Sequence, residues 1–489
     1  MIEPDRVRHD LGMETTTSTG TGAASTGAGS ASAAATSAAA ASASTNSVLR
    51  GEEAVRFTSE LIRIDTTNRG GGDCRERPAA EYAAERLAEA GLSPVVLESA
   101  PGRANVVTRI RGSEPGLPAL LVHGHLDVVP AEAADWTVPP FSGEIRDGVV
   151  WGRGALDMKG MDAMMLAVAR AWGREGRGPR RDVVLCFTAD EEDSAEAGAD
   201  WLVKQHADLF EGCTEAIGES GGYTVHTAAG QRFYPVAAGE RGTGWLRLTA
   251  RGTAGHGSKP NPANAVTRLS AAMARIGSYR WPARITPTVR ASLLALGAAT
   301  GVPLTERELD DPGFDVDAYV ARLDPAAARL VAGTLRNSAN PTVLRAGYKT
   351  NVIPGLAEGE VDGRTLPGPG LAAEFEAALD ELTGPDVEWS YRQQSPALTA
   401  PVDVPVFAAM AAALQAHDPG ADVVPFSMTG GTDAKQFSEL GVQAYGFSPL
   451  RLPPGFDFQG LFHGVDERVP ADALVFGAAV LDDFLSTTS

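Results

Sequence analysis

Residues 119–127 read ALLVHGHLD, and residues 182–193 read DVVLCFTADEED. Each stretch opens with a short apolar run and then changes abruptly to histidine or carboxylate side chains. Short apolar runs are typical of central strands that are buried on both faces of a sheet. Ligands in open α/β sheets bind beyond the carboxyl ends of such strands. The two stretches therefore predict an α/β sheet whose polar residues collect at one edge.

Helical patterns separate the strands. Residues 78–90 are amphipathic and are followed by Gly91, a residue suited to the left-handed position after a helix. Beyond Gly242 the pattern changes, because residues 245–250 alternate in polarity like a half-buried strand and a helix follows at 262–276. Further strands and a second helix complete what we expect to be a compact inserted α+β domain.

At 489 residues the chain is too long for a single hydrophobic core, so several domains are expected. The α/β pattern predicts a catalytic domain in two pieces, residues 48–242 and 396–489, around an insertion at 243–395. Within the insertion, residues 283–345 have no evident role. Residues 1–47 are mostly Ala, Ser, Thr and Gly. They have little apolar surface to offset the entropy cost of ordering, so we expect a disordered tail.

Composition excludes several classes of partner. The net charge is −20, and such an acidic surface repels nucleic acid and anionic membranes, so neither is expected to bind. No apolar stretch approaches the roughly 20 residues of a membrane span, and the N-terminus lacks the apolar core of a secretory signal. The three cysteines have no CxxC spacing and fit a reducing compartment. The sequence thus predicts a cytoplasmic globular protein.

Three polar clusters in the first half of the chain carry candidate chemistry. His125 and Asp127 follow the first strand, where an imidazole can bind a metal and a carboxylate can hold its other ring nitrogen. Asp157 lies in the glycine-rich WGRGALDMKG, where its simpler role would be to cap the following helix. Glu191 and Glu192 belong to four consecutive carboxylates, which repel one another unless cations offset them. A solvated acidic loop is the simpler alternative.

Two more clusters complete the set. Glu219 lies in IGESGG, and His463 lies in LFHGVDER near the C-terminus. Each is ambiguous alone, since a single histidine is usually structural. Together, two histidines, one aspartate and two glutamates supply the nitrogen and oxygen donors for a pair of zinc ions that share one carboxylate. Two ions about 3.5–4 Å apart can clamp a hydrolytic water between them.

The order of these motifs resembles the M20 family of metallopeptidases, which includes glutamate carboxypeptidase, acetylornithine deacetylase, succinyl-diaminopimelate desuccinylase and aminoacylase-1. The resemblance runs from about residue 50 to the end of the chain. It rests on HGHLDVVP, GRGALDMKG, ADEE, GES, GHGSKP, NVIP, GGTDA and HGVDE, in the family's order. It implies a mixed-sheet α/β/α catalytic domain with an inserted α+β ferredoxin-like lid or dimerisation domain.

The resemblance also implies two Zn²⁺ ions per subunit, with Co²⁺ or Mn²⁺ as alternatives. His125 and Glu219 would bind one ion, and Glu192 and His463 would bind the other. Asp157 would bridge both ions.

Further roles follow from the same resemblance. Asp127 would orient His125, and Glu191 would be the general base. His256 in GHGS would reach the scissile carbonyl, which in dimeric relatives it does from the partner subunit. The residues that hold the oxyanion region and the substrate carboxylate would be Asn351, Arg364, Gly430, Gly431 and Thr432.

The predicted function is hydrolysis of an amide or peptide bond next to a free carboxylate, by a carboxypeptidase, dipeptidase or N-acyl-amino-acid deacylase. The substrate would be a small peptide or an N-acyl amino acid, and the lid would support a homodimer. Two departures from the family pattern bear on substrate fit: Ser194-Ala195 replaces a common Gly-Gly pair, and Lys435 replaces a common Arg. One alternative is a ureido amidohydrolase of the allantoate type. Another is a non-catalytic dimerisation or binding relative, which should have lost a ligand or the base, and none is lost.

Overall fold

The computed structural model describes residues 28–489. Contacts divide the chain into a short N-terminal unit, residues 1–46, and a large unit, residues 47–489. The helix α1 (Ala28–Ile62) begins in the first unit, where the sequence predicted a disordered tail. Alanine has the highest helix propensity of all residues, which accounts for helical backbone in this Ala-rich tract. The tail prediction for residues 1–27 lies outside the described residues.

In the part of the chain that the structure describes, ten strands form one mixed sheet. The parallel pairs are β3 with β6, β3 with β7, β7 with β18, and β9 with β17, and the remaining pairs are antiparallel. The order along the sheet is β1 (Val95–Ala100), β2 (Arg103–Ile110), β6 (Val183–Thr188), β3 (Ala119–His125), β7 (Cys213–Gly218), β18 (Gln443–Gly446), β9 (Arg232–Glu240) and β16 (Leu398–Thr399), with β17 (Asp422–Met428) and β8 (Val225–His226) also paired to β9. The predicted mixed α/β sheet is confirmed.

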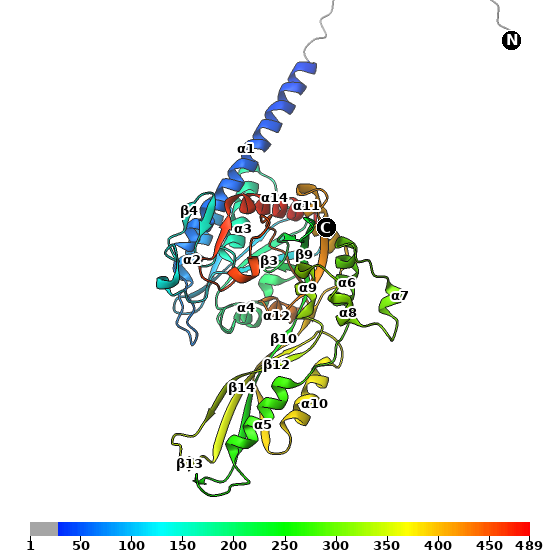
Figure 1. Ribbon diagram of the computed structural model, residues 1–489. Helices are drawn as coiled ribbons and strands as arrows, with labels where there is room; N and C mark the ends of the chain where they lie inside the picture. The colour runs from blue at the N-terminus through cyan, green and yellow to red at the C-terminus, as the bar shows by residue number, and fades with distance from the viewer. Residues whose placement is uncertain (1–27) are drawn as a thin grey trace, which may run out of the picture. The chain divides into compact units, whose positions relative to one another are not determined.

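Helices cover both faces of this sheet. One face packs against the C-terminal half of α1 and against α2 (Arg77–Glu89), α3 (Lys159–Glu175), α11 (Pro405–His417) and α14 (Ala471–Thr487). The other face packs against α4 (Ala199–Gln205) and α12 (Ala434–Ser438). Figure 1 shows α11 and α14 above the sheet and α4 and α12 below it. No helix among residues 28–489 has the length and apolar character needed to cross a bilayer.

A second, smaller sheet has four antiparallel strands in the order β12 (Ser338–Ala346), β14 (Leu356–Thr365), β10 (Gly242–Arg251) and β15 (Val387–Ser395). Along the chain, the elements follow as strand, helix, strand, strand, helix, strand. The helices α5 (Ala265–Ser278) and α10 (Leu371–Thr383) pack on the sheet and share one apolar core with it. Side chains of β10 alternate between buried and more exposed, as the polarity pattern of 245–250 predicted.

The segment between α5 and β12 returns to the large sheet. It contains α6 (Pro287–Ala299), α7 (Glu306–Leu309), α8 (Val316–Val320) and α9 (Pro325–Ala332), whose apolar side chains pack against β9 and β17. The prediction that all of residues 243–395 form the inserted domain is therefore wrong for these helices; Figure 1 shows α6 and α9 near β9 and α7 farther out. The sequence shows that each helix has an apolar face but not which sheet covers it.

This placement predicts the effect of a core truncation. Leu293 on α6 is fully buried in the cluster formed with β9 and β17. Leu293→Ala should lower the free energy of unfolding by about 2–5 kcal/mol, because it leaves a cavity in the core of the large sheet. Urea unfolding measures this loss, and Leu344→Ala, at a half-exposed site on β12, is the control. Equal effects of the two substitutions would contradict the packing.

Candidate metal centre

Three neighbouring strands carry the candidate metal ligands. In the large sheet β3 lies between β6 and β7, and all three run parallel. His125 ends β3, Glu191 and Glu192 follow β6, and Glu219 follows β7. Because parallel strands end at the same edge of a sheet, these side chains meet there.

Asp157 and His463 reach this edge from outside the large sheet. Asp157 lies between β5 (Val149–Trp151) and α3, while His463 precedes β19 (Arg468–Pro470). A small three-stranded sheet pairs β5 with β19 and with β4 (Glu144–Arg146), and places Arg468 opposite Trp151. This pairing brings together two loops that lie far apart in the sequence.

The two carboxylate oxygens of Asp157 face different histidines. Oδ1 lies 3.1 Å from Nε2 of His125, and Oδ2 lies 3.1 Å from Nε2 of His463. Glu219 Oε2 is 3.9 Å from Nε2 of His125, and Glu192 Oε2 is 3.1 Å from Nε2 of His463. The arrangement fits one carboxylate shared between two ions, with one histidine and one glutamate completing each side.

The capping role considered for Asp157 is excluded by the start of α3. The helix begins at Lys159, its N-cap residue is Met158, and no side chain caps it. The Lys159 side chain is fully buried and donates to the carbonyl oxygens of Leu61 and Ile64. Asp157 is thus free of the helix and directed to the histidines.

The cluster holds more negative charge than its histidines offset. Burial raises the pKa of Glu191 and of Glu219 well above the ordinary carboxyl value, and neighbouring carboxylates add to both rises. Burial also acts to raise the pKa of Asp157, but hydrogen bonds with His125 and His463 outweigh it, and this pKa lies below its ordinary value. Hydrogen bonding to Asp157 and Glu192 raises the pKa of His463 to about 10. Such a pocket favours bound cations.

The spacing of the donor atoms fits metal ions. Two ligand atoms about 2.1 Å from a tetrahedral zinc ion are about 3.4 Å apart, and the four nitrogen–oxygen separations given above span 3.1–3.9 Å. Donor atoms of two sets, His125 with Asp157 and Glu192, and His125 with Glu191 and Glu219, each gather within 4.8 Å. Among residues 45–489, Glu192 Oε1 is one of the buried polar atoms without a hydrogen-bond partner. A cation would supply that partner.

Asp127 orients His125 differently from the expectation. Nδ1 of His125 lies 3.0 Å from the main-chain carbonyl oxygen of Asp127, whereas the nearest carboxylate oxygen is 3.7 Å away. The fully buried carboxylate accepts instead from the main-chain N–H groups of Glu191 and Glu192, at 3.2 and 3.1 Å. The expected carboxylate contact is corrected, because this side chain is occupied in holding the acidic loop.

Glu467 is a positioning residue that was not among the predicted site residues. It is fully buried and accepts from the main-chain N–H groups of Leu156 and Asp157, at 2.7 and 3.1 Å. It also pairs with Arg153, whose Nη2 donates to the carbonyl oxygen of His463. One ion pair therefore supports the loops of two candidate ligands. The signal for it was the acid at the end of HGVDE.

A pocket of about 630 Å³ opens beside the cluster and has a cationic end. Arg364 and Lys435 line it there, together with the predicted residues Gly430, Gly431 and Thr432. Arg364 donates to Asp362 and to Thr243 Oγ1. The Nζ of Lys435 donates to the Arg241 carbonyl oxygen and to Ser395 Oγ, at 2.9 and 3.0 Å. Arg364 and Lys435, two of the three Arg and Lys side chains that line the pocket, are suited to a carboxylate.

The other end of the same pocket is largely apolar. Tyr223 and Phe458 stack with ring centroids 3.9 Å apart, and Phe462 packs edge-on against Phe458. Arg329 and Leu330 of α9 also line the pocket, whereas Met428 of β17 lies near Lys435, since Met428 O accepts from the N–H of Arg241 and Lys435 donates to Arg241 O. The helices between α5 and β12 thus contribute to the pocket, which no motif in the sequence indicated.

His256 and Asn351 do not join this pocket within the described chain. His256 belongs to β11 (Gly255–His256), which pairs with β13 (Val352–Ile353) directly after Asn351. Both side chains are exposed, and the lining of the pocket includes neither of them. Eleven of the thirteen predicted site residues therefore lie in the ligand cluster, beside it or along the pocket. His256 and Asn351 do not.

Known sequences that are similar to this chain point to one protein family. Residues 121–487 match the model of peptidase family M20/M25/M40. The human N-fatty-acyl-amino acid synthase/hydrolase PM20D1 is 27% identical over 388 residues, which cover 74% of this chain and 73% of that protein. Mouse aminoacylase-1 is 26% identical over 426 residues, which cover 84% of this chain and 92% of that protein.

Solved structures share the fold. The M20 family metallo-carboxypeptidase Sso-CP2 from Sulfolobus solfataricus has a TM-score of 0.66 at 17% identity, covering 89% of this chain and 98% of that one. The Bacillus subtilis YXEP protein, a dinuclear metal-binding peptidase, has a TM-score of 0.55 at 13% identity, with coverages of 89% and 98%. The chain therefore belongs to peptidase family M20/M25/M40, a family of hydrolases that includes dinuclear metal-binding peptidases.

Proposed function

We propose that this protein is a two-zinc amidohydrolase that cleaves an amide or peptide bond next to a free carboxylate. The observation that carries the proposal is the placement of Asp157, whose two oxygens face His125 and His463 at equal distances of 3.1 Å. One ion would be held by His125, Glu219 and Asp157, and the other by His463, Glu192 and Asp157. Cobalt(II) or manganese(II) would suit the same donors.

Bound zinc supplies a Lewis acid for the amide carbonyl and lowers the pKa of a water molecule towards about 7. Glu191 is the candidate base, since its carboxylate lies 3.9 Å from Nε2 of His125, beside the ligands, and its main chain is held by Asp127. It takes a proton from the attacking water and returns it to the leaving nitrogen. Burial raises the pKa of Glu191 well above the ordinary carboxyl value, which makes its carboxylate a stronger base.

The cationic end of the pocket selects the substrate. A free carboxylate would bind Arg364 and Lys435, and the neighbouring amide would then lie towards the metal ligands. The apolar end, with Tyr223, Phe458 and Leu330, suits an apolar acyl group or side chain. N-acyl amino acids and dipeptides with apolar residues are therefore the substrates we propose. The names of the relatives human PM20D1 and mouse aminoacylase-1 support this class.

The small sheet with α5 and α10 would act as a ferredoxin-like lid and as the dimer interface. Its element order, with β10 and β14 at the centre of the sheet, supports that assignment. His256 and Asn351 would then reach the pocket of a second copy of the chain, where His256 would stabilise the oxyanion. Their exposure and their separation from the pocket of their own chain support this arrangement.

The metal requirement can be measured apart from activity. Zinc added to chelator-treated protein should raise the melting temperature, because an ion that binds only the folded state at 100 times its Kd contributes about 2.7 kcal/mol. Turnover should disappear on chelation and return with zinc. In Asp157→Asn the zinc-induced rise should be much smaller. A chelator-treated protein that keeps both its melting temperature and its turnover would contradict the metal assignment.

Glu191→Gln removes the base while keeping the size of the side chain. Turnover of an N-acyl amino acid should fall by at least about 10²–10⁴-fold, the usual contribution of a general base, while zinc content stays at the wild-type level. The control is Glu196→Gln, an exposed position on the same loop. Wild-type turnover in Glu191→Gln would remove Glu191 from the mechanism.

The carboxylate-binding role of Arg364 calls for a matched pair of substrates. Arg364→Met should raise KM for an N-acyl amino acid by about 10–100-fold, since a charge-assisted hydrogen bond contributes about 1.5–3 kcal/mol. For the corresponding amino-acid amide, which has no carboxylate, KM should change little. Equal effects of Arg364→Met on the N-acyl amino acid and on the amide would refute the role of Arg364. Turnover of a ureido acid by the wild-type protein in the same assay would distinguish the allantoate-type alternative from the proposed function.

Mixing two defective variants tests whether His256 acts across subunits. His256→Ala should lower kcat by about 10²–10³, as the loss of an oxyanion donor does. Refolding His256→Ala together with Glu191→Gln should restore part of the activity, because each mixed dimer contains one site with both residues intact. Unmixed samples of each variant are the control. An inactive mixture that still forms dimers would show that His256 does not act in trans.

A further inference from the structure

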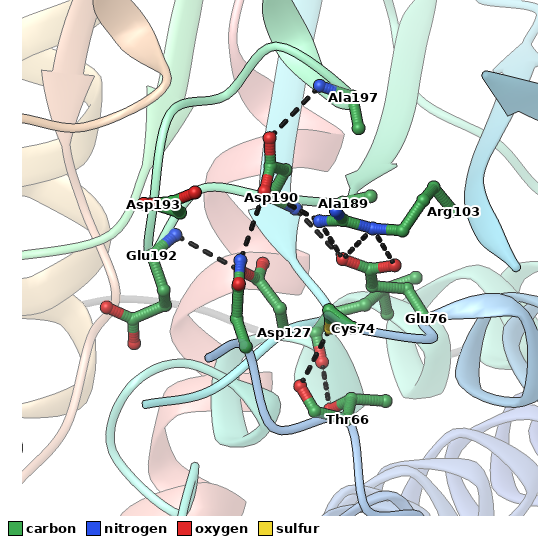
Figure 2. Close-up of polar contacts among 12 residues, drawn as sticks. Thr66, Cys74, Glu76, Arg103, Asp127, Ala189, Asp190, Glu192, Asp193 and Ala197 are labelled. Atoms are coloured by element: carbon green, nitrogen blue, oxygen red, sulfur yellow. Dashed lines mark hydrogen bonds and ion pairs between the residues drawn. The ribbon is translucent and has the colours of Figure 1, made fainter. Parts of the chain in front are cut away.

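A buried ion-pair network lies behind the acidic loop, on the side away from the metal ligands. Arg103 on β2 is 5% exposed and forms hydrogen bonds to Glu76, which is fully buried, from Nε at 2.8 Å and from Nη2 at 2.8 Å. The same Nη2 donates to Asp190 Oδ1 at 2.6 Å. Figure 2 shows Arg103 on one side of Asp190 and the side chain of Glu192 directed to the other. A buried ion pair often adds little to the free energy of unfolding, so stabilisation alone does not explain this network.

Asp190 is held at both carboxylate oxygens and in its main chain. Oδ2 accepts from Ser194 Oγ at 2.9 Å and from the N–H of Ala197 at 3.1 Å, so the loop folds back on its own first acid. The main-chain N–H of Asp190 donates to Glu76 Oε1. Asp190 has a φ of +66°, a conformation that a non-glycine residue keeps only when its surroundings impose it.

Asn68 joins this network to the carboxylate that holds the candidate base. Its side-chain amide donates to Asp190 Oδ1 at 3.1 Å and to Asp127 Oδ2 at 2.9 Å. Asp127 in turn accepts from the main-chain N–H groups of Glu191 and Glu192. A continuous chain of hydrogen bonds therefore runs from Arg103 to the two glutamates.

The network separates carboxylates that are consecutive in the sequence. Asp190 turns towards Arg103, Glu191 and Glu192 face the metal centre, and Asp193 accepts from the main-chain N–H of Gly71. Without the charge of Arg103, Asp190 would lie beside buried acids with no cation among its partners. Like charges so close repel strongly, so Arg103 offsets the repulsion between Asp190 and Glu76 and lets Asp190 keep its place at the start of the acidic loop.

We propose that Arg103, acting through Asp190 with Asn68, is a positioning residue that directs Glu191 to the attacking water and Glu192 to a metal ion. The inference rests on the proposed function, because it concerns how its base and one of its ligands are oriented. It adds a requirement on residues that touch neither substrate nor metal. Supports of this kind alter metal affinity or activity by about 10–100-fold.

The test compares two arginine-to-lysine substitutions in buried ion pairs. Arg103→Lys keeps the charge but cannot hold Glu76 and Asp190 with one planar group. Arg181→Lys makes the same change in the fully buried partner of Glu215, at the far end of β6 from the metal centre. We expect about 10–100-fold lower kcat and weaker cobalt binding in Arg103→Lys, with KM within about twofold of wild type. Arg181→Lys should change neither.

Asn68→Ala provides a second arm that leaves every charge in place. It should lower kcat and cobalt affinity in the same direction with KM unchanged, and it decides the matter should Arg103→Lys fail to fold. Wild-type kcat and cobalt affinity in Asn68→Ala and in a folded Arg103→Lys would overturn the inference, as would equal losses in Arg103→Lys and Arg181→Lys. A wild-type protein that binds cobalt but hydrolyses no amide would instead overturn the proposed function, and cobalt affinity would still test the network.

Discussion

Mutual repulsion among buried carboxylates is the constraint on which the rest of this structure depends. Asp157, Glu191, Glu192 and Glu219 converge on one pocket, and burial raises the pKa of the three glutamates. Desolvation and like charge both oppose the folding of the three glutamates into this cluster, and only Asp157 is stabilised by its hydrogen bonds with the histidines. The arrangement becomes favourable when cations enter. The ligand set is therefore better explained as a binding site than as part of the stabilising core.

The fold meets this constraint with two separate devices. Parallel strands β6, β3 and β7 deliver three of the ligand-bearing segments to one sheet edge, and hydrogen bonds from the main-chain N–H groups of Glu191, Glu192 and Asp157 then hold these three acids. Asp127 holds Glu191 and Glu192 by their N–H groups, while Glu467 holds the N–H of Asp157. Both supports are themselves fully buried carboxylates. Buried carboxylates thus position the acids of the cluster by accepting hydrogen bonds from the main-chain N–H groups of those acids.

The sequence predicted the large sheet and the five metal-ligand candidates because these follow from local patterns. Apolar runs that end in HGHLD and TADEED indicate both a strand and its functional edge, and the order of motifs supplied the family. Other features depend on contacts between distant residues. No local pattern tells that α6 packs on β17, that the carboxylate of Asp127 turns away from His125, or that Glu467 supports Asp157. Where His256 acts depends on a second chain and stays a prediction.

The crossings between the two sheets are where the structure places two of the cationic side chains of the pocket, as the proposed cleavage next to a carboxylate would require. The chain passes from β9 to β10 at Arg241 and from β15 to β16 after Ser395, and Lys435 donates to both points. Arg364 donates to Thr243, at the start of β10. Arg364 and Lys435 are thus fixed to the crossings, while three of the candidate metal ligands, His125, Glu192 and Glu219, are fixed to the ends of β3, β6 and β7. Lysine is a point charge, so under the proposed function planar recognition of a carboxylate would fall to Arg364.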